Sequence, residues 1–117
     1  MIENDAVEAF NNRLTIDPNT IKKMTPQQLD NVKNIGSQAE NLLRNKDFAY
    51  FVHTYKFECI DQLAEIATYT QADDAKRIAI SNQIAGIDGF VKSLKRAVYY
   101  KNRVVTNQTK QSEEPIA

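Results

Sequence analysis

The sequence predicts an all-α protein organised around an antiparallel helical hairpin. Apolar residues recur in alternating steps of four and three through the C-terminal half of the chain: Ile80, Ile84, Ile87, Val91, Leu94 and Val98. This spacing gathers them on one narrow seam of a helix, which needs a partner helix to cover it. A similar apolar seam precedes this one in the sequence. The 117 residues include only 3 Gly and 3 Pro, which favours long helices over a turn-rich β fold.

Residues 1–24 are expected to form a short N-terminal helical arm. Asp5 is a suitable cap for a first short helix. The apolar stripe of that helix comprises Val7, Phe10 and Leu14. Asp17-Pro18 is the start signal of a second short piece. Because isolated short helices are marginally stable in water, we expect the arm either to dock on the rest of the chain or to order on a partner.

The first substantial helix is predicted over about residues 26–45. The segment Thr25-Pro26-Gln27-Gln28 is typical of a capping box with proline at the first helical position. The apolar stripe that follows comprises Leu29, Val32, Ile35, Ala39, Leu42 and Leu43. Asn45-Lys46-Asp47 then breaks the pattern.

The hairpin is predicted to consist of helices over about residues 47–70 and 74–105. Asp47 is expected to cap the first of them. Its seam comprises Phe48, Val52, Tyr55, Cys59, Gln62, Ile66 and Tyr69, and the stripe is widened by Phe51, Ile60 and Leu63. A stripe this wide suits a helix that contacts two neighbours. The connection to the second helix is so short that the two helices must lie antiparallel.

The second hairpin helix is expected to begin with acidic residues and to end near Val105. Its seam continues through Lys101 and Val105. Residues 25–105 therefore make up the predicted folded domain. Residues 106–117 show no periodic apolar pattern, and we expect them to be a flexible, disordered tail.

Charge and composition narrow the class of protein. Fifteen basic and fifteen acidic residues cancel, so net charge alone predicts no polyanionic partner. A single cysteine rules out an internal disulfide and suits the reducing cytoplasm. No apolar run approaches the roughly 20 residues that span a bilayer, so we expect no membrane partner.

No pattern in the sequence predicts an enzyme. There is no Gly-rich phosphate loop, no Cys pair at metal-ligand spacing and no Ser elbow motif. His53 and Cys59 are the only residues of their types, and on a helix they point about 120° apart. We therefore expect no catalytic residue, no metal site and no cofactor.

Positive charge is concentrated toward the end of the long helix. Between Gly89 and Ser112 the sequence has six Lys or Arg residues and no acid. The residues that could contact a partner or nucleic acid are Lys92, Lys95, Arg96, Tyr99, Tyr100, Lys101 and Arg103. A basic helix with interleaved aromatic residues can bind phosphate groups and stack on exposed bases. The other interpretation is a solvated helix end whose bases complement the helix dipole.

Ala85, Gly86 and Gly89 leave a smooth patch in the middle of the long helix. Each glycine costs the helix about 1 kcal/mol relative to alanine, so a close helix contact is expected there in compensation. Two contacts are open: approach of Phe57 and Tyr55 from the first hairpin helix, or close crossing by a second subunit.

A further pattern spans roughly residues 40–98. It comprises Leu42-Leu43, Asp47-Phe48, Phe51-Val52, Asp73-Asp74, Arg77, Ile84, Ile87 and Leu94. This pattern resembles small helical-hairpin proteins encoded by tailed bacteriophages. The resemblance implies a non-enzymatic role in a virion, in its assembly or in DNA packaging, and it transfers no functional residue.

We therefore expect a structural or assembly protein that acts by helix packing, as a homo-oligomer or within a larger complex such as a phage virion. The alternative is a nucleic-acid-binding module that uses the basic, tyrosine-containing end of the long helix. The expected location is the cytoplasm of the host cell or the virion.

Overall fold

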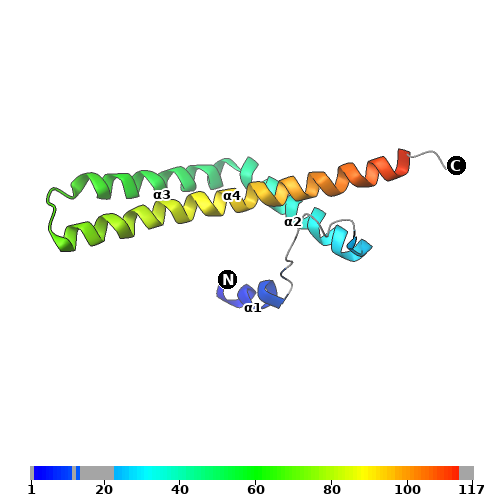
Figure 1. Cartoon of the computed structure of the whole chain (residues 1–117), viewed down its shortest axis with the longest axis horizontal. Helices are drawn as coiled ribbons and strands as arrows, with labels where there is room; N and C mark the ends of the chain where they lie inside the picture. Colours follow the sequence, from blue (N-terminus) through cyan, green and yellow to red (C-terminus); the bar gives the residue numbers. More distant parts are fainter. Residues whose placement is uncertain (1, 12, 14–22, 114–117) are drawn as a thin grey trace.

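The structure of the chain, a computed structural model, describes residues 2–11, 13 and 23–113. This part of the chain contains four α-helices and no strand. They are α1 (Ile2–Asn11), α2 (Pro26–Arg44), α3 (Lys46–Glu65) and α4 (Gln71–Glu113). The predicted all-α fold, a hairpin preceded by a helix, is thus confirmed (Figure 1).

Helix α4 runs through the whole body of the molecule, and α2 and α3 follow one another along it (Figure 1). Both run antiparallel to α4, because residues later in α2 and α3 meet residues earlier in α4. Three contacts show this order: Lys33 Nζ with Gln108 Oε1 at 3.2 Å, Phe48 with Phe90 at 6.2 Å between ring centroids, and Lys56 Nζ with Asp88 Oδ1 at 2.8 Å. The body is therefore two helices thick, with a break at Asn45 in one of the two layers.

The most fully buried packing lies between α2 and the C-terminal half of α4. Val32 and Val104 are each 1% exposed and form a common apolar cluster. Met24, Leu29 and Tyr100 pack against this pair. Leu29 and Val32 of the predicted stripe thus pack against α4, whereas Ile35 and Leu42 are exposed and the prediction is wrong for these two. The part of α4 that extends beyond α3 is covered by α2.

Gly36 allows α2 and α4 to approach closely. A Cβ atom placed on Gly36 would lie 2.3 Å from Lys101 Cβ and 2.8 Å from the Ala97 carbonyl oxygen. There is no room for a side chain at this position. The helix cost of this glycine, about 1 kcal/mol relative to alanine, is thus offset by close packing of the two backbones.

Side chains cap the start of α2 and of α3. Thr25 Oγ1 accepts a hydrogen bond from Gln28 N at 3.2 Å, and Gln28 Oε1 accepts one from Thr25 N at 3.0 Å, which is the predicted capping box. The cap of α3 is Asn45, whose Oδ1 accepts from Phe48 N at 2.9 Å, and not Asp47 as predicted. Asn45 takes this role because its extended backbone already ends α2, which leaves Asp47 inside the first turn of α3.

Between α3 and the N-terminal half of α4 only a narrow seam is buried. Cys59 and Ile80 are its buried members, and the free Cys59 thiol lies 3.7 Å from Gln83 Oε1. Cys59 therefore lies where the seam prediction places it. The predicted seam positions at Tyr55, Gln62 and Tyr69 are wrong, because all three side chains are exposed. The half-buried Leu63 takes the place of Gln62. Leu63 follows Cys59 by four residues and is apolar, whereas Gln62 follows it by three residues and is polar, so the helix buries Leu63.

The connection between α3 and α4 is longer than predicted. Helix α3 ends at Glu65 rather than near Thr70, and α4 begins at Gln71. The segment 66–70 contains β-branched residues and a tyrosine, which lose side-chain freedom in a helix. The Thr70 hydroxyl accepts a hydrogen bond from Asp73 N at 3.2 Å, so it caps α4 instead of extending α3.

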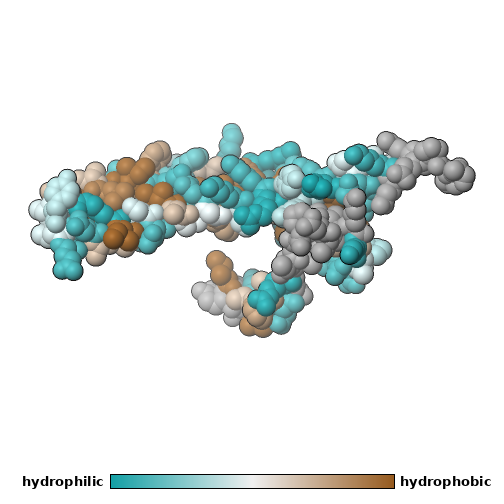
Figure 2. Space-filling model, viewed as in Figure 1, coloured by the Kyte–Doolittle hydropathy of each residue, from teal (hydrophilic) through white to brown (hydrophobic). Residues whose placement is uncertain are grey.

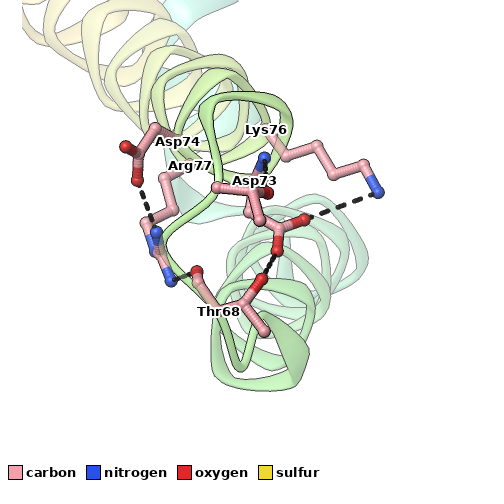
Figure 3. Close-up of polar contacts among 6 residues, drawn as sticks. Thr68, Asp73, Asp74, Lys76 and Arg77 are labelled. Atoms are coloured by element: carbon pink, nitrogen blue, oxygen red, sulfur yellow. Dashed lines mark hydrogen bonds and ion pairs between the residues drawn. The ribbon is translucent and has the colours of Figure 1, made fainter.

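Arg77 ties this connection to α4 (Figure 3). Its guanidinium donates to Asp74 Oδ1 at 2.7 Å and to the Thr68 carbonyl oxygen, and it lies 4.5 Å from the centre of the Tyr69 ring. The Thr68 hydroxyl donates to Asp73, and this hydrogen bond holds the pKa of the Asp73 carboxyl below its ordinary value. Side-chain contacts rather than apolar burial therefore hold the turn.

Replacing Arg77 with alanine is expected to lower the free energy of unfolding by about 1–2 kcal/mol, because three contacts of one charged group are lost. Urea denaturation followed by circular dichroism measures this. Lys76→Ala is the matched control, because Lys76 is 68% exposed and reaches Asp73 only at 4.0 Å. Such an exposed ion pair contributes less than about 1 kcal/mol. Equal effects of the two substitutions would contradict the role given to Arg77.

Helix α4 continues past the predicted end at Val105 to Glu113. Its contacts with α2 run through Ala97, Lys101, Val104 and Gln108. Ala97 and Val104 each precede a predicted seam position, Val98 and Val105, by one residue. One residue is a rotation of about 100° around the helix, so α2 and α3 pack on different sides of α4. Val105 is consequently 41% exposed, and the prediction that places it in the seam is corrected to Val104. Residues 114–117 of the predicted tail lie outside the described residues.

Helix α1 forms part of the predicted N-terminal arm. Its apolar side chains Ile2, Val7 and Phe10 are exposed, and the Arg13 guanidinium lies 4.0 Å from the centre of the Phe10 ring. The stripe position at Leu14 and the start signal at 17–18 lie outside the described residues. The exposed stripe of α1 is available to a partner, as the expectation that the arm orders on a partner requires.

Candidate functional site

The seven predicted contact residues at the end of the long helix fall into two groups. Tyr100 and Lys101 are used within the chain, since Tyr100 packs against the Val32–Val104 pair. Lys101 Nζ donates to Glu40 Oε2 at 2.9 Å. The other five are exposed: Lys92, Lys95, Arg96, Tyr99 and Arg103.

Glu40 is the acid that holds Lys101 to α2. Its Oε1 also lies 2.7 Å from Arg44 Nη2. The hydrogen bond from Lys101 and the charge of Arg44 hold the pKa of the Glu40 carboxyl below its ordinary value. This pairing therefore contributes stability above the ordinary pKa of glutamate and loses it as the pH falls through the lowered value. Lys101 is thus a link between α2 and α4 rather than a residue open to a partner.

The exposed residues form a basic ridge along α4, defined as Lys92, Lys95, Arg96, Tyr99, Arg103 and Lys110. Lys110 is exposed and belongs to the ridge, although the predicted contact residues do not include it, because the predicted helix ends at 105. At about 1.5 Å per residue the ridge is about 27 Å long. Among the described residues, none of its five cations has a carboxylate within ion-pair distance.

The helix dipole does not account for the ridge. Because α4 ends at Glu113, only Lys110 lies in its last turn. The stabilisation of a cation by the dipole falls off within that turn. The interpretation as a helix end with complementary bases therefore applies to Lys110 alone, and the other four cations belong to the middle of a helix.

Tyr99 lies within the ridge and is 52% exposed. Its hydroxyl accepts a hydrogen bond from Arg103 Nη1 at 3.0 Å, and its ring packs edge-on against Tyr100 with 5.6 Å between centroids. These two contacts hold an exposed ring in place among cations. A shallow depression beside it is lined by Tyr99, Asn102, Arg103, Thr106, Asn107 and Lys110.

Ala85, Gly86 and Gly89 have no close helix contact within the described part of the chain. All three are exposed, and a Cβ atom on either glycine would meet nothing within 4 Å. The expected approach of Phe57 and Tyr55 to this patch is therefore wrong, because the hairpin packs through a different side of α4. Close crossing by a second subunit stays a prediction.

Aromatic side chains lie on the same side of the hairpin as Gly86. Phe90 follows Gly86 by one helical turn and packs edge-on against Phe48 of α3. Phe51 and Tyr55 follow Phe48 at helical spacing, on the same side of α3. We call the set Phe51, Tyr55, Gly86 and Phe90 the aromatic flank, and all of its rings are exposed. The apolar side chains that Figure 2 shows near the connection of α3 and α4 are a separate patch, because the members of the aromatic flank lie about three to five helical turns from that connection.

The chain exposes much more surface than a globular protein of the same mass. Its accessible surface is 9400 Å², whereas a compact monomer of 13.3 kDa exposes about 6,500 Å². Its radius of gyration is 19.9 Å, compared with about 13 Å for a compact domain of this length. A body two helices thick covers the facing seams and leaves the sides of both helices open.

The described residues offer no group of three or more His, Cys, Asp or Glu side chains that could hold a metal ion. None of the helices in this part of the chain is long and apolar enough to cross a membrane.

Comparison with known proteins finds no match among protein-family models, curated proteins or solved structures. The resemblance to phage hairpin proteins therefore stays a prediction from the residue pattern.

Proposed function

We propose that the protein is a non-enzymatic structural or assembly protein that works by helix packing, and that its first partner is a second copy of the chain. The observation that supports this most strongly is the exposed aromatic flank on a hairpin only two helices thick. Burying a large apolar side chain gains roughly 1.5–3 kcal/mol, so rings clustered on one flank favour cover by a further helix. Large exposed apolar side chains gathered on one side of a monomer make that side a candidate for a protein interaction site.

The flank is suited to pairing with itself. A two-fold interface uses the same patch on both subunits, so the patch must offer both projections and recesses. Phe51 and Phe90 are the projecting rings, 69% and 47% exposed. Gly86 leaves open space in front of the helix backbone. A ring from one copy placed over the glycine of the other would also offset the helix cost of Gly86.

The setting we propose is a phage virion or an assembly in the cytoplasm of the host cell. Its support is the resemblance of the hairpin pattern to phage-encoded proteins. The exposed apolar stripe of α1 offers a second surface through which such a complex could be held together.

Self-assembly is tested by analytical ultracentrifugation over a range of protein concentrations. The wild-type chain is expected to reach at least twice its monomer mass of 13.3 kDa at high concentration. Phe51→Ser should raise the concentration of half-assembly at least about tenfold if Phe51 is a central hot spot of the interface, because loss of a hot spot costs about 2 kcal/mol or more and about 1.4 kcal/mol is already tenfold. Phe51 is largely exposed in the single chain, so circular dichroism should show an intact fold.

Phe57→Ser is the matched control, since it removes an exposed phenylalanine from another side of α3, outside the flank. It should leave the assembly midpoint within about twofold. A wild-type chain that stays at 13.3 kDa at every concentration would overturn the proposal of self-assembly. Equal weakening by the two variants would overturn the assignment of the interface to the flank.

A further inference from the structure

We propose that the basic ridge of α4 binds the phosphate backbone of single-stranded nucleic acid, with Tyr99 stacking on one base. The ridge and the aromatic flank share no residue. Nucleic-acid binding is therefore independent of the self-assembly proposed above, and each can fail without the other.

The ridge carries positive charge that the described chain does not neutralise. Helix α4 has no acid between Asp88 and Glu113. Glu40, the acid that α2 directs at this half of α4, is engaged by Lys101 and Arg44. The net charge of the whole chain is zero, so the ridge creates a local positive potential on a molecule that is neutral as a whole. Such a potential concentrates anions at one surface.

The spacing of the cations suits a polyanion rather than a single small anion. Successive cations of the ridge are between about 1.5 Å (Lys95 to Arg96) and about 10.5 Å apart along the helix axis and follow a line over about 27 Å. They do not converge on one point, so a lone phosphate could meet only one or two of them. A strand with regularly repeated phosphates can meet them in turn, which is how basic surfaces follow single-stranded backbones.

Tyr99 favours a nucleic acid over an acidic protein as the ligand. Its ring is half exposed, and contacts with Arg103 and Tyr100 already hold it in position. Every nucleobase has a face that can stack on such a ring, whereas a carboxylate gains nothing from it. The amides of Asn102 and Asn107 line the adjoining depression and offer donors and acceptors to a base edge. An unpaired strand has free base faces to supply, and a duplex does not.

The test is the fluorescence anisotropy of a labelled oligothymidylate titrated with the full chain. If all five cations contact phosphates, a plot of log affinity against log salt has a slope of about −3.5. The double variant Arg96→Gln with Arg103→Gln should weaken binding at least about tenfold at about 50 mM salt, and should make the slope shallower by about 1.4. The matched control Lys46→Gln with Lys76→Gln removes the same charge from exposed positions off the ridge. It should change the affinity less than about twofold.

Two further measurements separate the ligand classes. Tyr99→Ala should weaken binding of the oligothymidylate at least about fivefold, and Tyr99→Phe should not. A duplex should bind more weakly than the single strand. The proposal is overturned if the wild type does not bind at low salt, if the two double variants weaken binding equally, or if the duplex binds more tightly. It is also overturned if polyglutamate displaces the label as well as unlabelled oligothymidylate does, since the ligand would then be an acidic protein.

Discussion

Replacing Val104 with aspartate is expected to lower the free energy of unfolding by more than about 4 kcal/mol. Val104 is 1% exposed and packs with Val32 between α2 and α4. A carboxylate there would be buried among apolar side chains, and the nearby Lys101 is already engaged by Glu40. An unpaired buried charge is among the few single changes that cost this much. Urea denaturation followed by circular dichroism should show the loss.

Val105→Asp is the matched control, since it makes the same change at the adjacent position. Val105 is 41% exposed, so its substitution should cost less than about 1 kcal/mol. The periodicity of the sequence alone makes the opposite prediction, because it places Val105 in the seam. A larger effect at Val105 than at Val104 would show that α2 does not pack on α4 through Val104.

Replacing Gly36 with alanine is expected to lower the free energy of unfolding by about 1–3 kcal/mol, although alanine is the better helix former. The new Cβ would lie 2.3 Å from Lys101 Cβ and 2.8 Å from the Ala97 carbonyl oxygen. The carbonyl belongs to the backbone and cannot rotate away, so the two helices must move apart. Thermal or urea denaturation measures the loss, and α2 and α4 should separate first because the strain lies between them.

Gly86→Ala provides the comparison, because the same substitution meets no atom within 4 Å there. It should raise the free energy of unfolding by about 1 kcal/mol at concentrations where the chain is monomeric. One substitution thus has opposite signs at two positions of the same protein. If the aromatic flank pairs as proposed, Gly86→Ala should also weaken self-association. A loss of monomer stability at both positions would refute the assignment of Gly36 as the close contact.

Features with a strong local signal could be predicted from the sequence. The capping box at Thr25 gives the start of α2, and the apolar period gives the helical hairpin and the burial of Cys59. The boundaries between helices could not be predicted as well, because capping residues compete. Asn45 and Asp47 are both suitable caps for the start of α3. Thr70, Asp73 and Asp74 are likewise all suitable caps for the start of α4. The arrangement of the helices in space decides each choice.

The candidate site could likewise be predicted only in part, because its composition is visible in the sequence and its packing is not. The sequence identifies a basic, tyrosine-containing segment, but it cannot say which members are free. Tyr99 and Tyr100 are neighbours, yet only Tyr100 faces α2 and joins the core. The three glycines all lie inside helices, where each costs stability relative to alanine and a close backbone contact would offset that cost. Only the packing of α2 on α4 shows that Gly36 has this contact within the chain and Gly86 does not.

The order in which the helices are made gives the antiparallel arrangement a further consequence. The contact of Arg77 with Thr68 joins residues 9 positions apart, whereas that of Lys33 with Gln108 joins residues 75 apart. Short loops close at the lowest entropic cost, so the chain is expected to zip from segment 66–70 toward Val32. During synthesis α2 and α3 leave the ribosome before α4, with their seams open to other nascent chains. Of the two helices that pack on α4, α2 is the first to be completed and the last to be covered.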